Sequence, residues 1–290
     1  MEIIRSIQSL ASPELDSVAL VITNLGSEYA YIALLLVGYL AVDSRFVRLL
    51  GISFCLGFYL NFVLKALFDT PRPFVNHPEL LRGAEAEATS LGEAFPSGHA
   101  QSSFTFWLFW AWFLRRRWFW GVAILLVFLI SLSRVYLGVH YPIDILGGWF
   151  FGALVIATAV YLSGHLRLSS LSRPWLFALG IALPFALHMF GDVPSSELFL
   201  GATAAFISGP LLIQHPTDGK LWGRIASAAL GLVLVFGVLL GSSALLSDSL
   251  KDDKIVSFIR YFVVSSTGIV LTPYLARLLR LVSPTQSNSP

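Results

Sequence analysis

Apolar runs that are long enough, or nearly long enough, to cross a lipid bilayer make up most of the chain. A helix needs about 20 residues to cross the hydrocarbon core, and fewer where its ends are buried in protein. We expect nine such helices, over residues 28–43, 47–68, 99–114, 118–135, 143–163, 174–191, 197–213, 222–246 and 256–279. The pattern predicts an all-α fold, a polytopic bundle of membrane helices. Three prolines fall inside these runs, where they kink a helix, namely Pro184, Pro210 and Pro273.

The first 27 residues have a different pattern. Four apolar side chains share one helical face, namely Ile3, Ile4, Ile7 and Leu10. Ser12 then has the position of an N-cap, and Pro13 that of the first helical residue. We expect two short amphipathic helices in residues 1–27. They lie either on the membrane surface or against the protein's own bundle.

Composition supports the membrane assignment and excludes other classes. Only 12% of the residues are charged, and the mean hydropathy is +0.75; a soluble domain carries about twice that share of charge. The net charge of +2 does not point to nucleic acid as a partner. The single cysteine, Cys55, excludes an intrachain disulfide and a thiolate metal cluster. No cleavable signal peptide is expected, because no basic segment precedes an apolar core at the N-terminus.

Basic residues suggest an orientation for the helices. If the N-terminus is outside and the helices alternate, 11 of the 19 basic residues lie inside. These are Arg45, Arg48, Arg115, Arg116, Arg117, Arg167, Arg173, Lys220, Arg224, Arg277 and Arg280. An excess of Lys and Arg marks the cytoplasmic side. We therefore expect an integral inner or plasma membrane protein with this orientation.

Three polar clusters stand at the ends of the predicted helices, all on the outer side. They are Lys65 to Pro73, Pro96 to His99, and Ser133 to Asp144. Among their residues are three cations, two histidines, the carboxylate of Asp144 and a Ser-Gly turn. Several cations suit a group with several anionic oxygens, such as a phosphate. A histidine with a carboxylate four residues later suits a nucleophile that is held in one tautomer.

These clusters resemble the K-x6-R-P, P-S-G-H and S-R-x5-H-x3-D motifs of the type 2 phosphatidic acid phosphatase (PAP2) family, which includes the vanadium haloperoxidases. Every fixed position is filled, and the order is the same. The positions are Lys65, Arg72, Pro73, Pro96, Ser97, Gly98, His99, Ser133, Arg134, His140 and Asp144. The motifs span 80 of the 290 residues. The family's six-helix core would extend to about residue 190.

The residues and the resemblance suggest the same roles. His140 attacks phosphorus and forms a phosphohistidine, while Asp144 orients its ring. His99 protonates the leaving oxygen and later activates water. The phosphate-binding residues are Lys65, Arg72, Arg134, Ser97 and Gly98. No metal and no other cofactor is expected, because three cations already neutralise the phosphate and no Asp/Glu cluster has ligand spacing.

The domain assignment follows from these patterns. We expect a catalytic core at 28–191, additional membrane helices at 192–282 and a disordered tail at 283–290. The substrate is a membrane lipid phosphate or diphosphate, with candidates from phosphatidic acid to undecaprenyl diphosphate. The active site lies on the outer, periplasmic or extracytoplasmic, side, and a homodimer is possible. The alternative is a multi-pass lipid transporter or scramblase built on a PAP2-like core. A haloperoxidase is disfavoured, because those enzymes are soluble.

Overall fold

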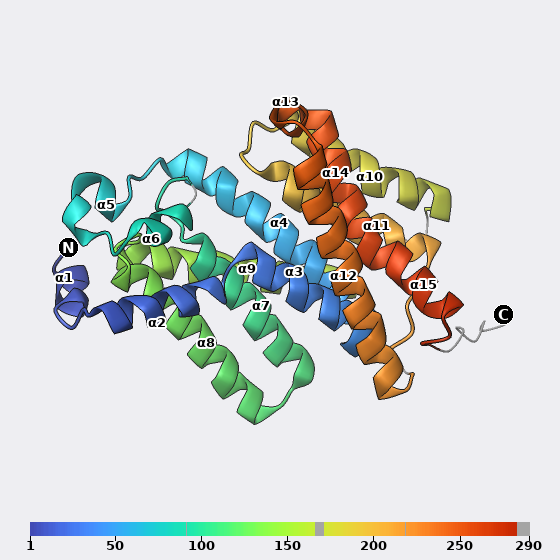
Figure 1. The fold of residues 1–290 in the computed structure, drawn as a ribbon, viewed down its shortest axis with the longest axis horizontal. Helices are drawn as coiled ribbons and strands as arrows, with labels where there is room; N and C mark the ends of the chain where they lie inside the picture. Colours follow the sequence, from blue (N-terminus) through green and yellow to red (C-terminus); the bar gives the residue numbers. More distant parts are fainter. Residues whose placement is uncertain (91, 166–170, 218, 283–290) are drawn as a thin grey trace. The chain divides into compact units, whose positions relative to one another are not determined.

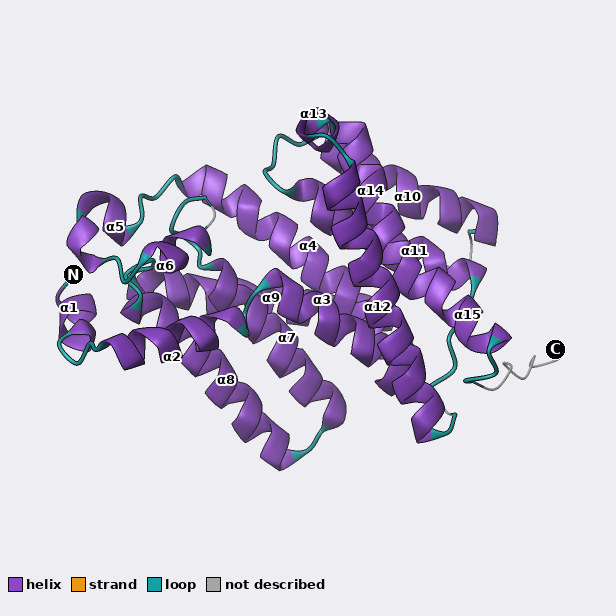
Figure 2. Cartoon of the chain, viewed as in Figure 1, coloured by secondary structure: helices purple, strands orange, loops and turns teal. Residues whose placement is uncertain are grey.

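A computed structural model describes residues 1–90, 92–165, 171–217 and 219–282. The regular elements of these residues are all helices, joined by short loops (Figures 1 and 2). The helices form two compact units. Unit 1 contains Met1–Tyr31 and Gly57–Gly164, and unit 2 contains Ile32–Leu56 and His165–Pro290. The predicted tail at 283–290 lies outside the described residues. The all-α prediction is confirmed.

Unit 1 holds all three polar clusters. It contains α1 (Glu2–Gln8), α2 (Pro13–Asn24), the start of α3 (Glu28–Val37), the end of α4 (Ser44–Phe68), α5 (Pro73–Asn76), η2 (Pro78–Leu80), α6 (Ala84–Ala88), α7 (Gly98–Leu114), α8 (Arg117–Tyr136) and most of α9 (Pro142–His165). Helices α7 and α8 form a hairpin (Figure 1), because Arg115 ends α7 in the left-handed conformation and α8 begins two residues later. Between the predicted helices at 47–68 and 99–114, the chain forms the short helices α5, η2 and α6.

The two predicted N-terminal helices are present. Ser12 caps α2, and its hydroxyl accepts from the backbone N–H of Leu15 at 3.2 Å. Both helices pack against α8, and Ile4 is completely buried. This packing is compatible with a position at the membrane surface, which stays a prediction. Together with residues 28–42, α2 also meets the length and hydropathy criteria for a single span, bent by 47°.

Unit 2 consists of η1 (Gly38–Val42), the start of α4, α10 (Arg173–Phe190), α11 (Ser196–Leu212), α12 (Leu221–Leu245), α13 (Asp248–Asp252), α14 (Lys254–Ser266), η4 (Thr267–Leu271) and α15 (Thr272–Leu278). Helix α11 lies against both α10 and α14. It is the centre of the unit's core, where Leu200, Ala204 and Ala205 are completely buried.

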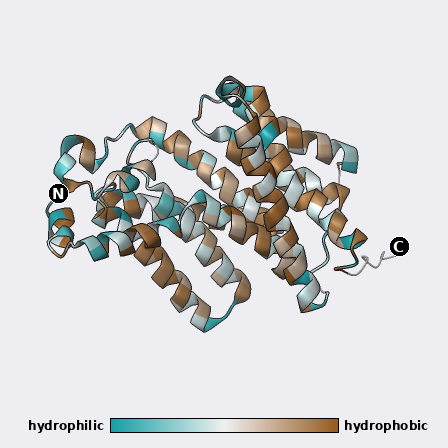
Figure 3. Ribbon diagram, viewed as in Figure 1, coloured by the Kyte–Doolittle hydropathy of each residue, from teal (hydrophilic) through white to brown (hydrophobic). Residues whose placement is uncertain are grey.

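The number of helices that can cross a membrane by their own length is lower than nine. Within the described residues six helices meet the criteria, or seven if the bent pair counts as one span. Helices α7 and α11 have 17 residues each, or about 26 Å at 1.5 Å per residue, against a hydrocarbon core of about 30 Å. All nine predicted runs are helical, but these two are short. Helix α8 is mostly hydrophobic along its length (Figure 3). Its apolar side chains Ile124, Leu125 and Phe128 stay exposed, as on a helix that faces lipid.

Several arginines that the sequence assigned to the inner side bond to backbone carbonyls in unit 2. Pro210 lies inside α11 and has no N–H, so the carbonyl of Phe206 loses its helical donor. Arg48 Nε donates to that carbonyl at 3.1 Å, and its Nη2 donates to the carbonyl of Ile207 at 3.2 Å. Arg173 likewise donates to Leu211 at 2.8 Å. Arg48 and Arg173 thus donate hydrogen bonds to helix carbonyls, in addition to any effect of their charge on the orientation of the helices in the membrane.

We predict that Arg48→Met lowers the free energy of unfolding by about 2 kcal/mol, because it leaves two carbonyls without a charged donor. The apparent midpoint of thermal unfolding in detergent should fall by about 5 °C. Arg45→Met is the matched control, since the Arg45 side chain is exposed. Equal midpoints for the two variants would show that the Arg48 bonds contribute nothing to stability.

Candidate active site

The loop between α8 and α9 places His140. Gly138 has φ +76, a left-handed conformation that favours glycine, and a Cβ at this position would lie 2.0 Å from the carbonyl oxygen of Leu80. The N–H of Val139 returns to the carbonyl of Arg134 at 3.2 Å, and the N–H of Arg82 bonds to the carbonyl of Leu137 at 3.2 Å. The turn is therefore packed tightly against the segment around η2, and it holds His140 in one position.

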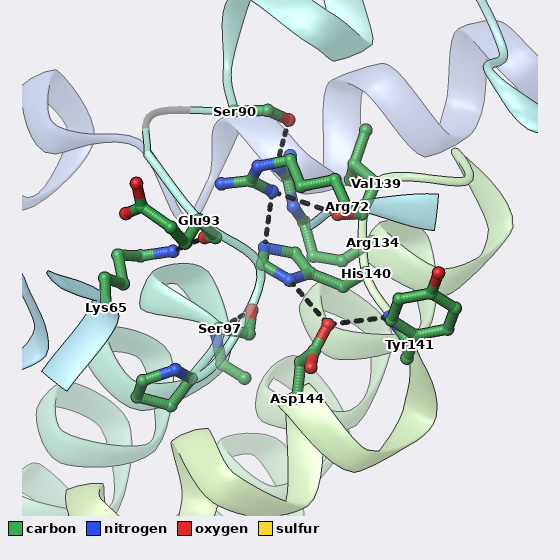
Figure 4. A network of polar contacts seen from close by, with 12 residues as sticks. Lys65, Arg72, Ser90, Glu93, Ser97, Arg134, Val139, His140, Tyr141 and Asp144 are labelled. Atoms are coloured by element: carbon green, nitrogen blue, oxygen red, sulfur yellow. Dashed lines mark hydrogen bonds and ion pairs between the residues drawn. The ribbon is translucent and has the colours of Figure 1, made fainter. Parts of the chain in front are cut away.

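His140 and Asp144 meet as the sequence predicted. His140 Nδ1 lies 3.2 Å from Asp144 Oδ2, which also accepts from the backbone N–H of Tyr141 at 2.8 Å (Figure 4). On the other side of the ring, Arg72 Nη1 lies 3.1 Å from His140 Nε2. Because a guanidinium can only donate, Nε2 must accept, and the ring proton is on Nδ1, facing the carboxylate. His140 therefore has its lone pair on Nε2.

Charge and burial keep this imidazole neutral. His140 is 1% exposed. Burial lowers the pKa of His140 well below its usual value, and the neighbouring positive charges of Arg72, Arg134 and Lys65 lower it further. At neutral pH the ring is thus unprotonated at Nε2, which is the form that a nucleophile requires.

The three predicted cations converge on the same place and are almost completely buried. Lys65, near the end of α4, donates to the backbone carbonyl of Glu93. Arg72, at the N-cap of α5, donates to the carbonyls of Gly92 and Val139 at 2.8 and 2.9 Å. Arg134, in the last turn of α8, is bound by threonine and serine oxygens. These partners are neutral, so they fix the cations without cancelling their charge.

The predicted Ser-Gly turn opens α7. Ser97 is the N-cap, its hydroxyl accepts from the N–H of Ala100, and its own N–H donates to the carbonyl of Asp144 at 3.0 Å. This last bond joins the start of α7 to the start of α9. Asn61 on α4 supports the turn, since its Nδ2 donates to the carbonyl of Pro96 at 3.3 Å and to Gln101 Oε1 at 2.9 Å.

His99 follows in the first turn of α7. Its Nε2 is buried and has no hydrogen-bond partner among the residues that the structure describes. A buried polar atom without a partner is costly, and such atoms are found at sites that bind a ligand. His99 is also one of the residues that line the cavity beside His140.

A cavity of about 250 Å³ collects these groups. Six of the eight predicted site residues line it, namely Lys65, Arg72, Gly98, His99, Arg134 and His140. Ser97 and Asp144 do not line the cavity. Ser97 caps the helix that carries His99, and Asp144 contacts the ring of His140. Three aromatic side chains, those of Tyr29, Phe58 and Phe62, also line the cavity. It therefore combines a cationic lining with an apolar one.

The sequence did not indicate two parts of this cavity. Residues Asn24, Gly26, Ser27, Glu28 and Tyr29, where α2 meets α3, line it, as do Ala88 and Thr89 at the end of α6. These residues carry no motif. Only the packing of α2 on α8 brings them there. No group of three or more His, Cys, Asp or Glu side chains that could hold a metal ion is found in the described parts of the chain.

Comparison with known proteins identifies the family. Residues 46–168 match the model of the PAP2 superfamily, and residues 195–285 match the transmembrane extension of PAP2 superfamily phosphatases. The putative undecaprenyl-diphosphatase YbjG of Escherichia coli is 33% identical over 116 residues, which are 40% of this chain and 56% of that protein. The undecaprenyl-diphosphatase BcrC of Bacillus subtilis is 30% identical over 187 residues, which are 60% of this chain and 86% of that protein.

A crystal structure of Aquifex aeolicus LpxE is also similar, with 26% identity and a TM-score of 0.49, over 55% of this chain and 93% of that one. The chain belongs to the PAP2 superfamily, as the three motifs suggested. It is a multi-pass integral membrane protein, with a PAP2 core followed by a C-terminal transmembrane extension.

We predict that Gly138→Ala disrupts the site, because the added methyl group meets the Leu80 carbonyl and the residue keeps a positive φ. Phosphatase activity should fall at least tenfold, and the free energy of unfolding by about 1–3 kcal/mol. Gly121→Ala on α8 is the control, since a methyl group at that position would meet no atom within 4 Å. If Gly138→Ala matched this control in activity and melting, the turn would not be what positions His140.

Proposed function

We propose that this protein hydrolyses a lipid phosphate or diphosphate at the outer membrane face, through a phosphohistidine and without a metal ion. The observation that carries the proposal is the placement of neutral His140 between the Asp144 carboxylate and the buried Arg72 guanidinium, at the edge of a cationic cavity. Undecaprenyl diphosphate is the first candidate substrate, because YbjG and BcrC carry that activity in their names.

In the first step, the phosphate oxygens replace His140 Nε2 as acceptor for Arg72, which frees the lone pair of Nε2. Nε2 then attacks phosphorus, and the bond from phosphorus to the leaving oxygen breaks. His99, protonated once the anionic phosphate offsets the surrounding positive charges, gives its proton to that oxygen, and Asp144 stabilises the positive charge on the His140 ring.

In the second step, His99 takes a proton from water, and the resulting hydroxide attacks the phosphohistidine. The N–P bond breaks, inorganic phosphate leaves, and both histidines return to their starting state. Lys65, Arg72 and Arg134 stay in contact with the equatorial oxygens throughout. Fixed charges of this kind are the main contribution of a protein to phosphoryl transfer.

The cavity suits an amphiphile. Its cationic residues take the phosphate, and the aromatic side chains of Tyr29, Phe58 and Phe62 take the first part of the hydrocarbon chain. The outer face is supported by α7, which begins at the site and ends next to Arg115, Arg116 and Arg117. Three arginines between two helices favour the inner side, so the other end of α7 is expected outside.

The transporter alternative receives less support. It would need charges on the additional helices that line a path, and Arg260 on α14 is the candidate. Its Nε donates to Ser242 Oγ at 2.9 Å and its Nη2 to the carbonyl of Leu239 at 3.4 Å, both on α12. Arg260 thus joins two helices of unit 2, as a structural residue does.

We predict that purified protein releases phosphate from undecaprenyl diphosphate in the presence of EDTA, and that orthovanadate inhibits it by mimicking five-coordinate phosphorus. The measurement is phosphate release across a panel with phosphatidic acid, phosphatidylglycerol phosphate, sphingosine-1-phosphate and glucose-6-phosphate. Strict dependence on Mg²⁺ would contradict the metal-independent mechanism. Release from none of the five substrates would contradict the proposed function.

We predict that His99→Asn accumulates a phosphoenzyme when the substrate is a terminally ³²P-labelled lipid diphosphate. A phosphate leaving group needs little protonation, so the first step proceeds while the activation of water is lost. The label should be acid-labile and alkali-stable, as a phosphohistidine is. His140→Ala should give no label and no turnover, with unchanged gel filtration in detergent. Label on a protein that lacks His140 would exclude it as the nucleophile.

A further inference from the structure

Four of the five N–H groups of Arg134 are bound by other groups of the protein. Its Nη1 donates to Thr23 Oγ1 at 2.8 Å and to Thr89 Oγ1 at 2.7 Å, and its Nη2 donates to the Thr89 carbonyl at 3.3 Å and to Ser90 Oγ at 3.0 Å. A guanidinium has five N–H groups, and these contacts occupy four. The fifth, on Nε, is buried and has no partner within the described chain.

The contact to Thr23 comes from a part of the chain without a motif. Thr23 is completely buried on α2, outside the residues that match the family models, 46–168 and 195–285. The Thr23 hydroxyl oxygen accepts from one N–H group of Nη1, and the Thr89 hydroxyl oxygen accepts from the other. Helix α2 and the segment beyond α6 therefore hold the guanidinium between them. Arg134 cannot rotate to present its two-nitrogen fork without breaking these bonds.

Helix α2 is itself fixed to the segment that carries Arg134. Arg82 binds the carboxylate of Asp16 through two bonds, at 3.1 and 2.7 Å, and the Tyr136 hydroxyl donates to the same carboxylate. Tyr136 stands two residues after Arg134 on α8. Gln8 on α1 adds bonds to the carbonyls of Leu80 and Tyr136 at 2.8 and 2.7 Å. The position of Thr23 relative to Arg134 is thus determined at several points.

We propose that Thr23 is a positioning residue for the phosphate site, which orients Arg134 so that Nε–H points at the transferred phosphoryl group. The inference rests on the proposed function, in which Arg134 binds that group. It makes the N-terminal helices a part of the active site. The hydroxyl matters because a buried guanidinium N–H without an acceptor is costly, and the side chain would turn to find one in the cavity.

The test compares four variants by kcat, KM and inhibition by orthovanadate. Thr23→Val and Thr23→Ala remove the hydroxyl, Thr23→Ser keeps it, and Thr105→Val makes the same change at a threonine on α7 that is 2% exposed and does not line the cavity. We expect both hydroxyl-free variants to lose about 10- to 100-fold in kcat, as a slightly misplaced binding group does. Vanadate affinity should fall in parallel, with KM for the lipid changed less. Thr23→Ser and Thr105→Val should behave like the wild type.

Some results would overturn the inference. A folded Thr23→Val or Thr23→Ala with wild-type kcat and vanadate affinity would do so, as would a Thr23→Ser protein that loses as much as Thr23→Val. If Thr23→Val does not fold, the comparison of Thr23→Ala with Thr23→Ser decides.

Failure of the proposed function is a separate result, seen as a wild-type protein that hydrolyses no substrate of the panel. Stabilisation of each protein against heat by orthovanadate then remains as a readout. Loss of that stabilisation in Thr23→Val and Thr23→Ala, with Thr23→Ser and Thr105→Val like the wild type, still supports the positioning of Arg134, and equal stabilisation of all variants overturns it.

Discussion

Three buried positive charges held by neutral partners are the constraint on which unit 1 depends. Burying a charge costs several kcal/mol even after the protein relaxes. Backbone carbonyls and hydroxyls around Lys65, Arg72 and Arg134 reduce this cost by hydrogen bonding, but they leave the positive field in place. The field lowers the pKa of His140 and attracts an anion. In the proposed mechanism, the same arrangement therefore prepares the nucleophile and selects the substrate.

This requirement explains the irregular segment between α4 and α7. A long helix has no spare carbonyls in its interior, because each accepts from the N–H four residues later. The turns and short helices from residue 69 to 97 leave the carbonyls of Gly92 and Glu93 and the carbonyl and hydroxyl of Thr89 available, and all of these bind the cations. The polar break in the hydropathy pattern thus provides hydrogen-bond acceptors for a cluster of charges in a protein that is otherwise apolar.

The residues with chemistry could be predicted from the sequence, and the residues that hold them could not. Lys65, Arg72, His99, Arg134 and His140 have charged or titratable side chains at motif spacing, and the structure brings all five to one cavity. Thr23 and Asn61 carry neither charge nor motif, and they reach the site only through the packing of α2 on α8 and of α4 on α7. The lengths of α7 and α11 agree with the predicted runs, but apolar composition does not distinguish a 17-residue helix from one that spans alone.

The bond between Arg72 and His140 Nε2 has a consequence for substrate choice. In the proposed mechanism, the lone pair that attacks phosphorus is the acceptor of Arg72 Nη1 at 3.1 Å, so a substrate must offer a better acceptor than an imidazole to release it. Phosphate oxygens do so because a charge-assisted bond between guanidinium and phosphate is about twice as strong as a neutral one. A neutral ester or a zwitterionic headgroup with a single shielded charge competes less well. His140 is thus freed only when an anionic phosphate is in place, which couples recognition of the headgroup to activation of the nucleophile.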